Sequence, residues 1–222
     1  MNLALFDLDG TLIAADSDHA FGDFMIALGW VDADQHRRRN DDFYRQYLAG
    51  CLDIDEYIAF STSAWRHRPL VAQQAASARF MAEVMAPQLK APARALLAKH
   101  RAAGDLVAIV TATNDFVTRP IADALGIEHL LAVQLERDAS GAATGRIHGV
   151  PSFREGKITR VHDWLHSLGH SLSGFEHSVF YSDSTNDLPL LEIVHEPVAT
   201  NPSPALEAIA LQRGWRILRL FE

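Results

Sequence analysis

"LALFDLDGTLIAADSDHAF", residues 3–21, runs from an apolar segment straight into a cluster of carboxylates. The apolar residues predict a short buried strand that stops at Asp7 and Asp9. A Gly-Thr pair then predicts a tight turn, and Asp16, Asp18 and His19 follow shortly after it. Because buried charges need a partner, this stretch predicts a functional site at the carboxyl end of the strand.

Similar apolar runs occur later in the chain and are separated by segments with helical periodicity. They are "LVAIVTA" (106–112), "SVFYSD" (178–183) and "EPVATN" (196–201), and "WRILRL" (215–220) is a candidate for a fifth strand. The helical segment 93–104 ends on Gly104 and the segment 119–126 ends on Gly126, which is typical of helix C-termini. This alternation predicts an α/β fold with a doubly wound parallel sheet.

Two segments interrupt the alternation. Residues 15–90 are helical in pattern throughout, so we expect a helical cap inserted after the first strand, over the carboxyl edge of the sheet. Residues 132–150 contain two short strand-like pieces around a Gly- and Ser-containing turn, which predicts a small β-hairpin. The predicted organisation is a catalytic core of residues 1–14 and 91–222 with a cap of residues 15–90.

Composition narrows the classes of function. The chain has 222 residues and a formal net charge of -8, which argues against nucleic acid as a main partner. No apolar run is long enough to span a bilayer, and the N-terminal residues lack the pattern of a signal peptide. The single cysteine, Cys51, allows no intramolecular disulfide and fits a reducing, cytoplasmic setting. We therefore expect a small-molecule substrate.

Three of the predicted strands end on polar side chains, and in open parallel sheets ligands bind beyond the carboxyl ends of strands. Asp7 and Asp9 would meet Thr111 from the second strand there, together with two acidic residues of the later stretch 181–191, Asp183 and Asp187. Four carboxylates in one pocket repel each other, and a divalent cation with oxygen ligands, Mg²⁺, would remove this repulsion. One carboxylate could act as a nucleophile while its neighbour transfers protons. Thr111 and Lys157 could stabilise an anionic group.

These residues resemble the four motifs of the haloacid dehalogenase-like superfamily. The matching stretches are "DLDGT" (7–11), Thr111, Lys157 and "YSDSTNDLPLL" (181–191). The insertion after the first motif and the hairpin before Lys157 resemble the phosphoserine-phosphatase-like branch. The second aspartate, Asp9, favours phosphoryl transfer, since the dehalogenases of the superfamily lack it.

The resemblance implies a role for each motif residue. Asp7 would attack phosphorus and become an aspartyl-phosphate, while Asp9 would protonate the leaving alkoxide and then activate water. Thr111 and Lys157 would bind phosphate oxygens. The Mg²⁺ ligands would be the Asp7 carboxylate, the Asp9 backbone carbonyl and Asp183, with Asp187 supporting the metal directly or through water. Near these motifs we also expect four residues to contact substrate: Thr11, Ala112, Thr113 and Asn114.

The cap sequence bears on the substrate. Asp16 matches an acidic residue that holds the substrate ammonium group in the phosphoserine branch, but "LDIDEYIAFSTS" (52–63) lacks the arginine that holds the serine carboxylate. Ala112 and Thr113 also replace smaller residues of the branch. The run "ADSDH" (15–19) is similar to that of related proteins that act on histidinol phosphate, an ester with an ammonium group and an imidazole but no carboxylate. Candidates for the amine and ring are Asp16, Asp18, Asn40, Asp41 and Tyr44.

The lead hypothesis is therefore a Mg²⁺-dependent phosphomonoesterase for a small amine-bearing phosphoester such as histidinol phosphate. Phosphoserine phosphatase is the alternative within the same class. A non-catalytic module that binds phosphorylated metabolites is the alternative from another class, and transfer to an acceptor other than water would use the same site.

Overall fold

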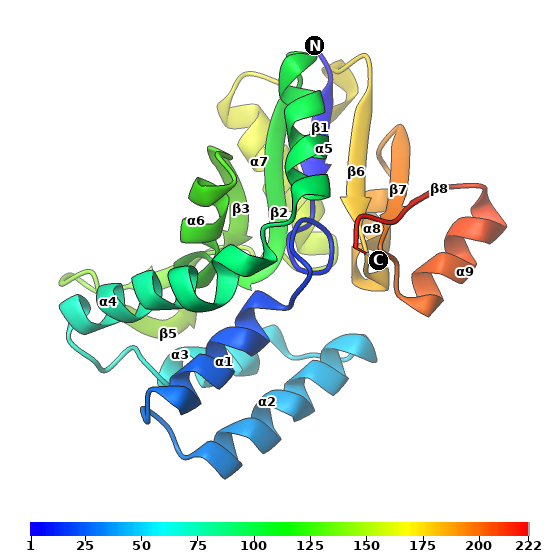
Figure 1. The fold of residues 1–222 in the computed structure, drawn as a ribbon. Coiled ribbons are helices and arrows are strands. Elements are labelled where there is room, and N and C mark those ends of the chain that lie inside the picture. Colours follow the sequence, from blue (N-terminus) through cyan, green and yellow to red (C-terminus); the bar gives the residue numbers. More distant parts are fainter. Residues whose placement is uncertain (222) are drawn as a thin grey trace.

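A six-stranded parallel sheet forms the centre of the protein in the computed structural model, which describes residues 1–221 (Figure 1). The strand order is β3-β2-β1-β6-β7-β8, so the first strand of the chain is central. The strands are β1 (Leu3–Phe6), β2 (Leu106–Asn114), β3 (His129–Val133), β6 (Ser178–Ser182), β7 (Glu196–Thr200) and β8 (Arg216–Leu218). This confirms the predicted doubly wound α/β fold.

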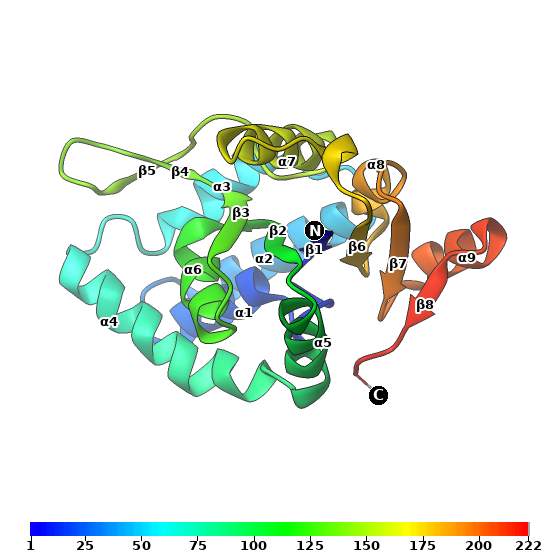
Figure 2. The same ribbon diagram turned by 90° about the horizontal axis from the view of Figure 1, so that it is seen from above.

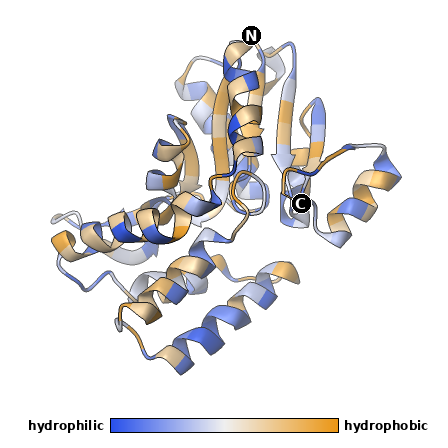
Figure 3. Cartoon of the chain, in the orientation of Figure 1, coloured by the Kyte–Doolittle hydropathy of each residue, from blue (hydrophilic) through white to orange (hydrophobic). Residues whose placement is uncertain are grey.

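Helices cover both faces of the sheet (Figure 2). Ala4 and Phe6 of β1 face α5 (Ala91–Ala102) and α6 (Asp115–Ala124), whereas Leu3 and Leu5 belong to the core on the opposite face. That second core is completed by α7 (Glu155–Ser167), α8 (Leu188–Leu191) and α9 (Pro204–Arg213). Because both faces are buried, the central strands β1 and β2 are mostly apolar, and β2 is largely orange in Figure 3.

Three helices lie beyond the carboxyl ends of the strands (Figure 1). They are α1 (Ser17–Ala27), α2 (Ala33–Leu48) and α3 (Ile54–Ser63), here called the cap helices. Each begins at an aspartate whose side chain accepts a hydrogen bond from the backbone N–H three residues on: Asp16, Asp32 and Asp53. The next helix, α4 (Leu70–Phe80), packs against α6 of the core and leads through short turns at Met81–Met85 and Ala86–Gln88 into α5.

The predicted hairpin is present as β4 (Leu135–Arg137) and β5 (Ala143–Ile147). It packs against α3, so it reaches from the core to the cap helices. The parallel strand β3 immediately before it was not predicted, because its short apolar run continues into the hairpin segment. No helix among residues 1–221 is long and apolar enough to cross a membrane.

Candidate active site

The loop after β1 carries the first two carboxylates to the edge of the sheet that faces the cap helices. Asp7 is buried, and Asp9 is mostly buried. Gly10, in the same loop, has a φ of +70°. A Cβ at this position would lie 2.5 Å from Oδ2 of Asp183, which is in the loop after β6. A side chain at position 10 is therefore excluded both by backbone conformation and by the close approach of the two loops.

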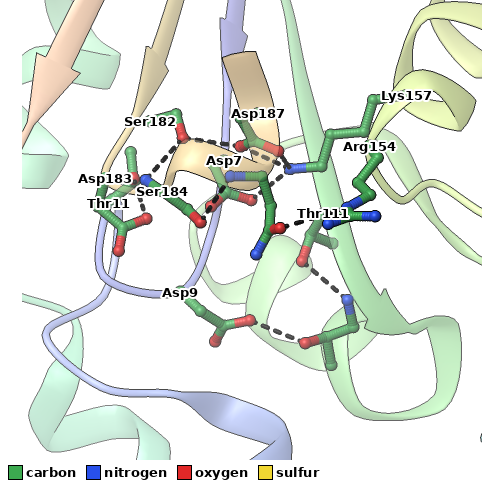
Figure 4. A network of polar contacts seen from close by, with 12 residues as sticks. Asp7, Asp9, Thr11, Thr111, Arg154, Lys157, Ser182, Asp183, Ser184 and Asp187 are labelled. Atoms are coloured by element: carbon green, nitrogen blue, oxygen red, sulfur yellow. Dashed lines mark hydrogen bonds and ion pairs between the residues drawn. The ribbon is translucent and has the colours of Figure 1, made fainter. Parts of the chain in front are cut away.

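Lys157, from the first turn of α7, joins two of the carboxylates (Figure 4). Its Nζ lies 3.0 Å from Asp7 Oδ1, and 2.7 Å and 2.8 Å from the two oxygens of Asp187. Ser182 donates a further hydrogen bond of 2.7 Å to Asp187. Only 1% of Lys157 is exposed. Burial alone would lower the pKa of this lysine, but Asp187 and Asp7 outweigh it and raise the pKa, so Lys157 stays charged.

The Asp7 carboxylate can act as a nucleophile in this setting. Burial raises its pKa to about 6, and the Lys157 ammonium group opposes that rise. Asp7 is therefore ionised at neutral pH, and Lys157 fixes one of its oxygens. Asp7 also lines the cavity described below.

Asp9 has a different environment, which suits proton transfer. The backbone N–H of Ser17 donates to its Oδ1 at 2.7 Å, and the Thr113 hydroxyl donates to its Oδ2 at 2.9 Å. Burial, followed by the charge of Asp16, raises the pKa of Asp9 to about 8. Two carboxylates separated by one residue thus have different protonation states near neutral pH, which is typical of a nucleophile and a general acid.

The end of β2 supplies the polar floor next to these carboxylates. Thr111 is buried and its hydroxyl accepts a hydrogen bond of 3.2 Å from the backbone N–H of Thr113. Thr111, Ala112 and Thr113 all line the cavity. Asn114 does not line it and instead begins α6, where its side chain accepts from Val117 and donates to Asp18.

Asp183, at the end of β6, makes one long side-chain hydrogen bond, 3.4 Å from the Thr11 hydroxyl. Burial, and then the charges of Asp7 and Asp187, raise the pKa of Asp183 well above its usual value. Three clustered carboxylates share the single positive charge of Lys157, so a divalent cation would neutralise the remainder. Oxygen donors of this kind fit Mg²⁺.

The donor set for such an ion would need a backbone group in addition to side chains. Among residues 1–221, no group of three or more His, Cys, Asp or Glu side chains is arranged to hold a metal ion. Asp187 uses both carboxylate oxygens on Lys157. Asp7 and Asp183 are therefore the carboxylates that could hold such an ion, with the Asp9 carbonyl as the expected third ligand, whereas Asp187 contacts Lys157.

A cavity of about 570 Å³ connects this edge of the sheet with the cap helices. Of the predicted substrate-binding residues, Asp16, Asp18, Tyr44, Ala112 and Thr113 line it. Thr11 and Asp41 do not: Thr11 contacts Asp183, and Asp41 lies 3.1 Å from His19 Nε2. Asn40, also a candidate, lines the cavity.

The aromatic wall of the cavity was not identified as a binding element from the sequence. Phe43, Tyr47 and Tyr57 line the cavity together with Tyr44. Phe43 and Tyr57 contact edge to face, with ring centroids 5.2 Å apart. The sequence had indicated only a helical pattern across residues 15–90, and such a pattern does not separate a cavity wall from a core.

Arg154 and Asn186, which lie outside the cap helices, bind the C-terminal end of α2. The Arg154 guanidinium donates to the Gly50 carbonyl and to Asn186 Oδ1, and Asn186 donates a hydrogen bond of 3.0 Å to the Tyr47 carbonyl. A Cβ at Gly50 would lie 2.8 Å from the guanidinium. Arg154 precedes Lys157 and Asn186 precedes Asp187, so the loops that carry two site residues also bind the cap helices.

Comparisons with known proteins identify the family and the fold. A family model described as haloacid dehalogenase-like hydrolase matches residues 4–192. A histidinol-phosphatase from Neisseria meningitidis is 42% identical over 217 residues, which cover 98% of each chain. A crystal structure of a protein of unknown function from Bordetella pertussis superposes with a TM-score of 0.93 at 48% identity over 99% of each chain. A substrate-bound phosphoserine phosphatase shares the fold, with a TM-score of 0.69 at 17% identity over 97% of this chain and 91% of that one.

Proposed function

The chain belongs to the haloacid dehalogenase-like hydrolase family and is a phosphatase of that family, and from this premise we propose a more specific activity. It hydrolyses a small, amine-bearing phosphomonoester in the cytoplasm, with Mg²⁺ and through an aspartyl-phosphate on Asp7. The observation that carries the proposal is the difference between Asp7 and Asp9. One carboxylate is ionised and fixed by Lys157, and the other, beside it, keeps its proton at neutral pH.

In the first step, an Asp7 oxygen forms a bond to phosphorus while the bond from phosphorus to the ester oxygen breaks. Asp9 gives its proton to the leaving oxygen, so an alcohol departs and Asp9 becomes a carboxylate. Lys157 keeps the Asp7 carboxylate in place and, with the Thr111 hydroxyl, offsets negative charge on the phosphoryl oxygens.

In the second step, the Asp9 carboxylate takes a proton from a water molecule as that water attacks phosphorus. The bond between phosphorus and Asp7 breaks, inorganic phosphate leaves, and both aspartates return to their starting states. The hydrogen bonds from Ser17 and Thr113 hold the Asp9 carboxylate in position for both proton transfers.

Mg²⁺ would be held by Asp7, Asp183 and the Asp9 carbonyl, where it supplies charge neutralisation for an attack by one anion on another. The fit rests on the uncompensated charge of the buried carboxylates and on the weak hydrogen bonding of Asp183. Residues 15–90 would act as a cap that excludes water during the first step and admits it for the second.

The favoured substrate is histidinol phosphate. The cavity wall presents the carboxylates of Asp16 and Asp18, and none of its lining residues, all within the described chain, is an arginine or a lysine. Such a wall attracts an ammonium group and repels a substrate carboxylate. The 42% identical relative named histidinol-phosphatase supports the same choice. Phosphoserine, which carries a carboxylate, is the alternative, supported by the shared fold of phosphoserine phosphatases.

A screen with Mg²⁺ tests the proposal. Histidinol phosphate, phosphoserine, phosphoethanolamine and phosphocholine are compared by phosphate release, with the Asp7→Asn variant as the control. We expect a preference for histidinol phosphate and no turnover by the variant. A preference for phosphoserine would overturn the substrate, and turnover by Asp7→Asn would overturn the nucleophile. Binding of these esters without hydrolysis of any would favour a binding module, and phosphate transfer to an added alcohol would favour a phosphotransferase.

A further inference from the structure

Asp18 is a buried carboxylate that the proposed reaction does not use. It lies in the first turn of α1, lines the cavity and is only 5% exposed. Asn114 donates a hydrogen bond of 3.3 Å to its Oδ1. Its Oδ2 is buried and has no hydrogen-bond partner among the described residues. A buried carboxylate oxygen without a donor is costly, so its presence in a cavity wall points to a ligand that supplies one.

The groups around Asp18 satisfy its carboxyl only in part. Burial and the negative charge of Asp16 raise the pKa of Asp18 to about 7, and the neighbouring Tyr57 hydroxyl, which interacts with this carboxyl as a donor, only partly opposes that rise. The nearest imidazole, that of His19, is directed to other carboxylates: its Nε2 lies 3.1 Å from Asp41 and its Nδ1 lies 3.8 Å from Asp23.

Asp16 and Asp18 are also not equivalent. Asp16 is the N-cap of α1, and one of its oxygens accepts a hydrogen bond of 2.8 Å from the backbone N–H of His19. Asp18, two residues further along the same helix, is instead held by Asn114, the N-cap residue of α6 in the core. The start of α1 therefore offers the cavity two acidic acceptors with different partners.

The wall beside Asp18 suits a flat ring. Tyr57 and Phe43 meet edge to face, and both line the cavity with Tyr44 and Tyr47. Aromatic side chains pack against a planar ring through face and edge contacts. When the ring is cationic, the attraction between the charge and the aromatic face adds to these contacts, which an alkyl ammonium group makes less extensively.

We propose that Asp18 is a specificity-determining residue that binds a second nitrogen-bearing group of the substrate, an N–H of a planar heterocycle such as imidazole, while Asp16 binds the ammonium group. Asn114 is a positioning residue that orients the Asp18 carboxylate. This inference rests on the proposed function for the location of the substrate. It adds that the enzyme selects substrates with two nitrogen-bearing groups over substrates with one.

The test compares kcat/KM for two esters, histidinol phosphate, which has an ammonium group and a ring, and phosphoethanolamine, which has an ammonium group only. Asp18→Asn keeps the shape of the side chain and an acceptor for Asn114. We expect it to lower kcat/KM for histidinol phosphate by about 10- to 100-fold and to change phosphoethanolamine much less. The matched control is Asp34→Asn, which removes an exposed acid from the first turn of α2.

A binding measurement keeps the inference testable apart from turnover. Calorimetry with the dephosphorylated alcohols, histidinol and ethanolamine, should show tighter binding of histidinol by the unchanged protein and loss of that difference in Asp18→Asn. An equal loss for both esters, or an unchanged difference between the alcohols, would overturn the role of Asp18 even where the protein proves to be an active phosphatase. If the unchanged protein hydrolyses none of the esters but binds histidinol more tightly than ethanolamine, and Asp18→Asn loses this preference, the proposed function is contradicted and the role of Asp18 is supported.

Discussion

The Thr113 hydroxyl donates a hydrogen bond of 2.9 Å to Asp9 Oδ2, from a strand that lies 104 residues further along the chain. This contact links Asp9, the proposed general acid, to Thr113 of β2. The phosphoserine-phosphatase-like branch has a smaller residue at the position of Thr113. A substitution of Thr113 can therefore change the pKa and the orientation of Asp9 without replacing Asp9 itself.

The pH dependence of kcat/KM should report the two aspartates. Asp9 must be protonated for the first step, so kcat/KM should fall as the pH rises through about 8. Asp7 must be ionised, so kcat/KM should also fall as the pH drops through about 6, or through a lower value once Mg²⁺ binds Asp7 and favours its charged form. A profile measured from about pH 5 to about pH 10 checks both limbs. Constant activity across the alkaline range would contradict the assignment of Asp9.

Thr113→Val should shift the alkaline limb. A hydroxyl that donates to a carboxylate favours its charged form, so removing it raises the pKa of Asp9. The limb should therefore move to higher pH, while activity at neutral pH falls by about 10-fold because Asp9 is less well oriented. Thr113→Ser, which keeps the hydroxyl, is the control and should retain the original profile. An unchanged limb in Thr113→Val would show that the contact does not affect the acid.

Lys157→Met should abolish turnover and lower stability. It leaves Asp7 and Asp187 buried without their counter-ion, a change that typically costs about 3–5 kcal/mol. Because burial raises the pKa of Asp7 in the folded state above its usual value, this group destabilises the folded state as the pH rises through about 6. Without Lys157 its pKa rises further, so the deficit should be larger at neutral pH than at about pH 5.

Urea unfolding at the two pH values measures this deficit. Lys99→Met, which removes an exposed lysine of α5, is the matched control and should unfold like the unchanged protein at both. A Lys157→Met deficit that grew as the pH fell would contradict the charge argument.

Mg²⁺ should raise the melting temperature of the protein. A ligand present at about 100 times its dissociation constant stabilises the folded state by about 2.7 kcal/mol, or several degrees. Asp183→Asn should lose most of this shift and should itself be more stable than the unchanged protein in the metal-free state, because it removes repulsion from Asp7 and Asp187. Asp163→Asn, on the exposed part of α7, is the control. An equal metal-induced shift in Asp183→Asn would place the ion elsewhere.

The sequence predicted the sheet and the residues at its carboxyl edge because both depend on local patterns. The apolar runs that end at Asp7, Thr111 and Asp183 mark the ends of parallel strands, and such ends meet at one edge. Strand β3 was missed because only Gln134 separates it from the hairpin segment, so its apolar residues were read as part of that segment.

The cap was less predictable, since its side chains are placed by contacts between distant segments. Asp41 had been expected to contact substrate, but it does not line the cavity; it lies on α2 against His19, which does line it. Tyr57 was not among the expected substrate-binding residues, although it lines the cavity beside Asp18. Pairs such as Arg154 with Gly50, 104 positions apart, have no signature in the sequence of either partner.

The central position of β1 has a consequence for how the protein is made. Its two neighbours, β2 and β6, begin about 100 and about 175 residues after it, so during synthesis on the ribosome the first strand emerges long before either partner exists. Until Ser178–Ser182 has left the exit tunnel, one edge of this apolar strand is unpaired. We expect the nascent chain to depend on chaperones over this interval, and substitutions that slow the pairing of β1 with β6 to reduce the yield of protein in cells more than they reduce its final stability.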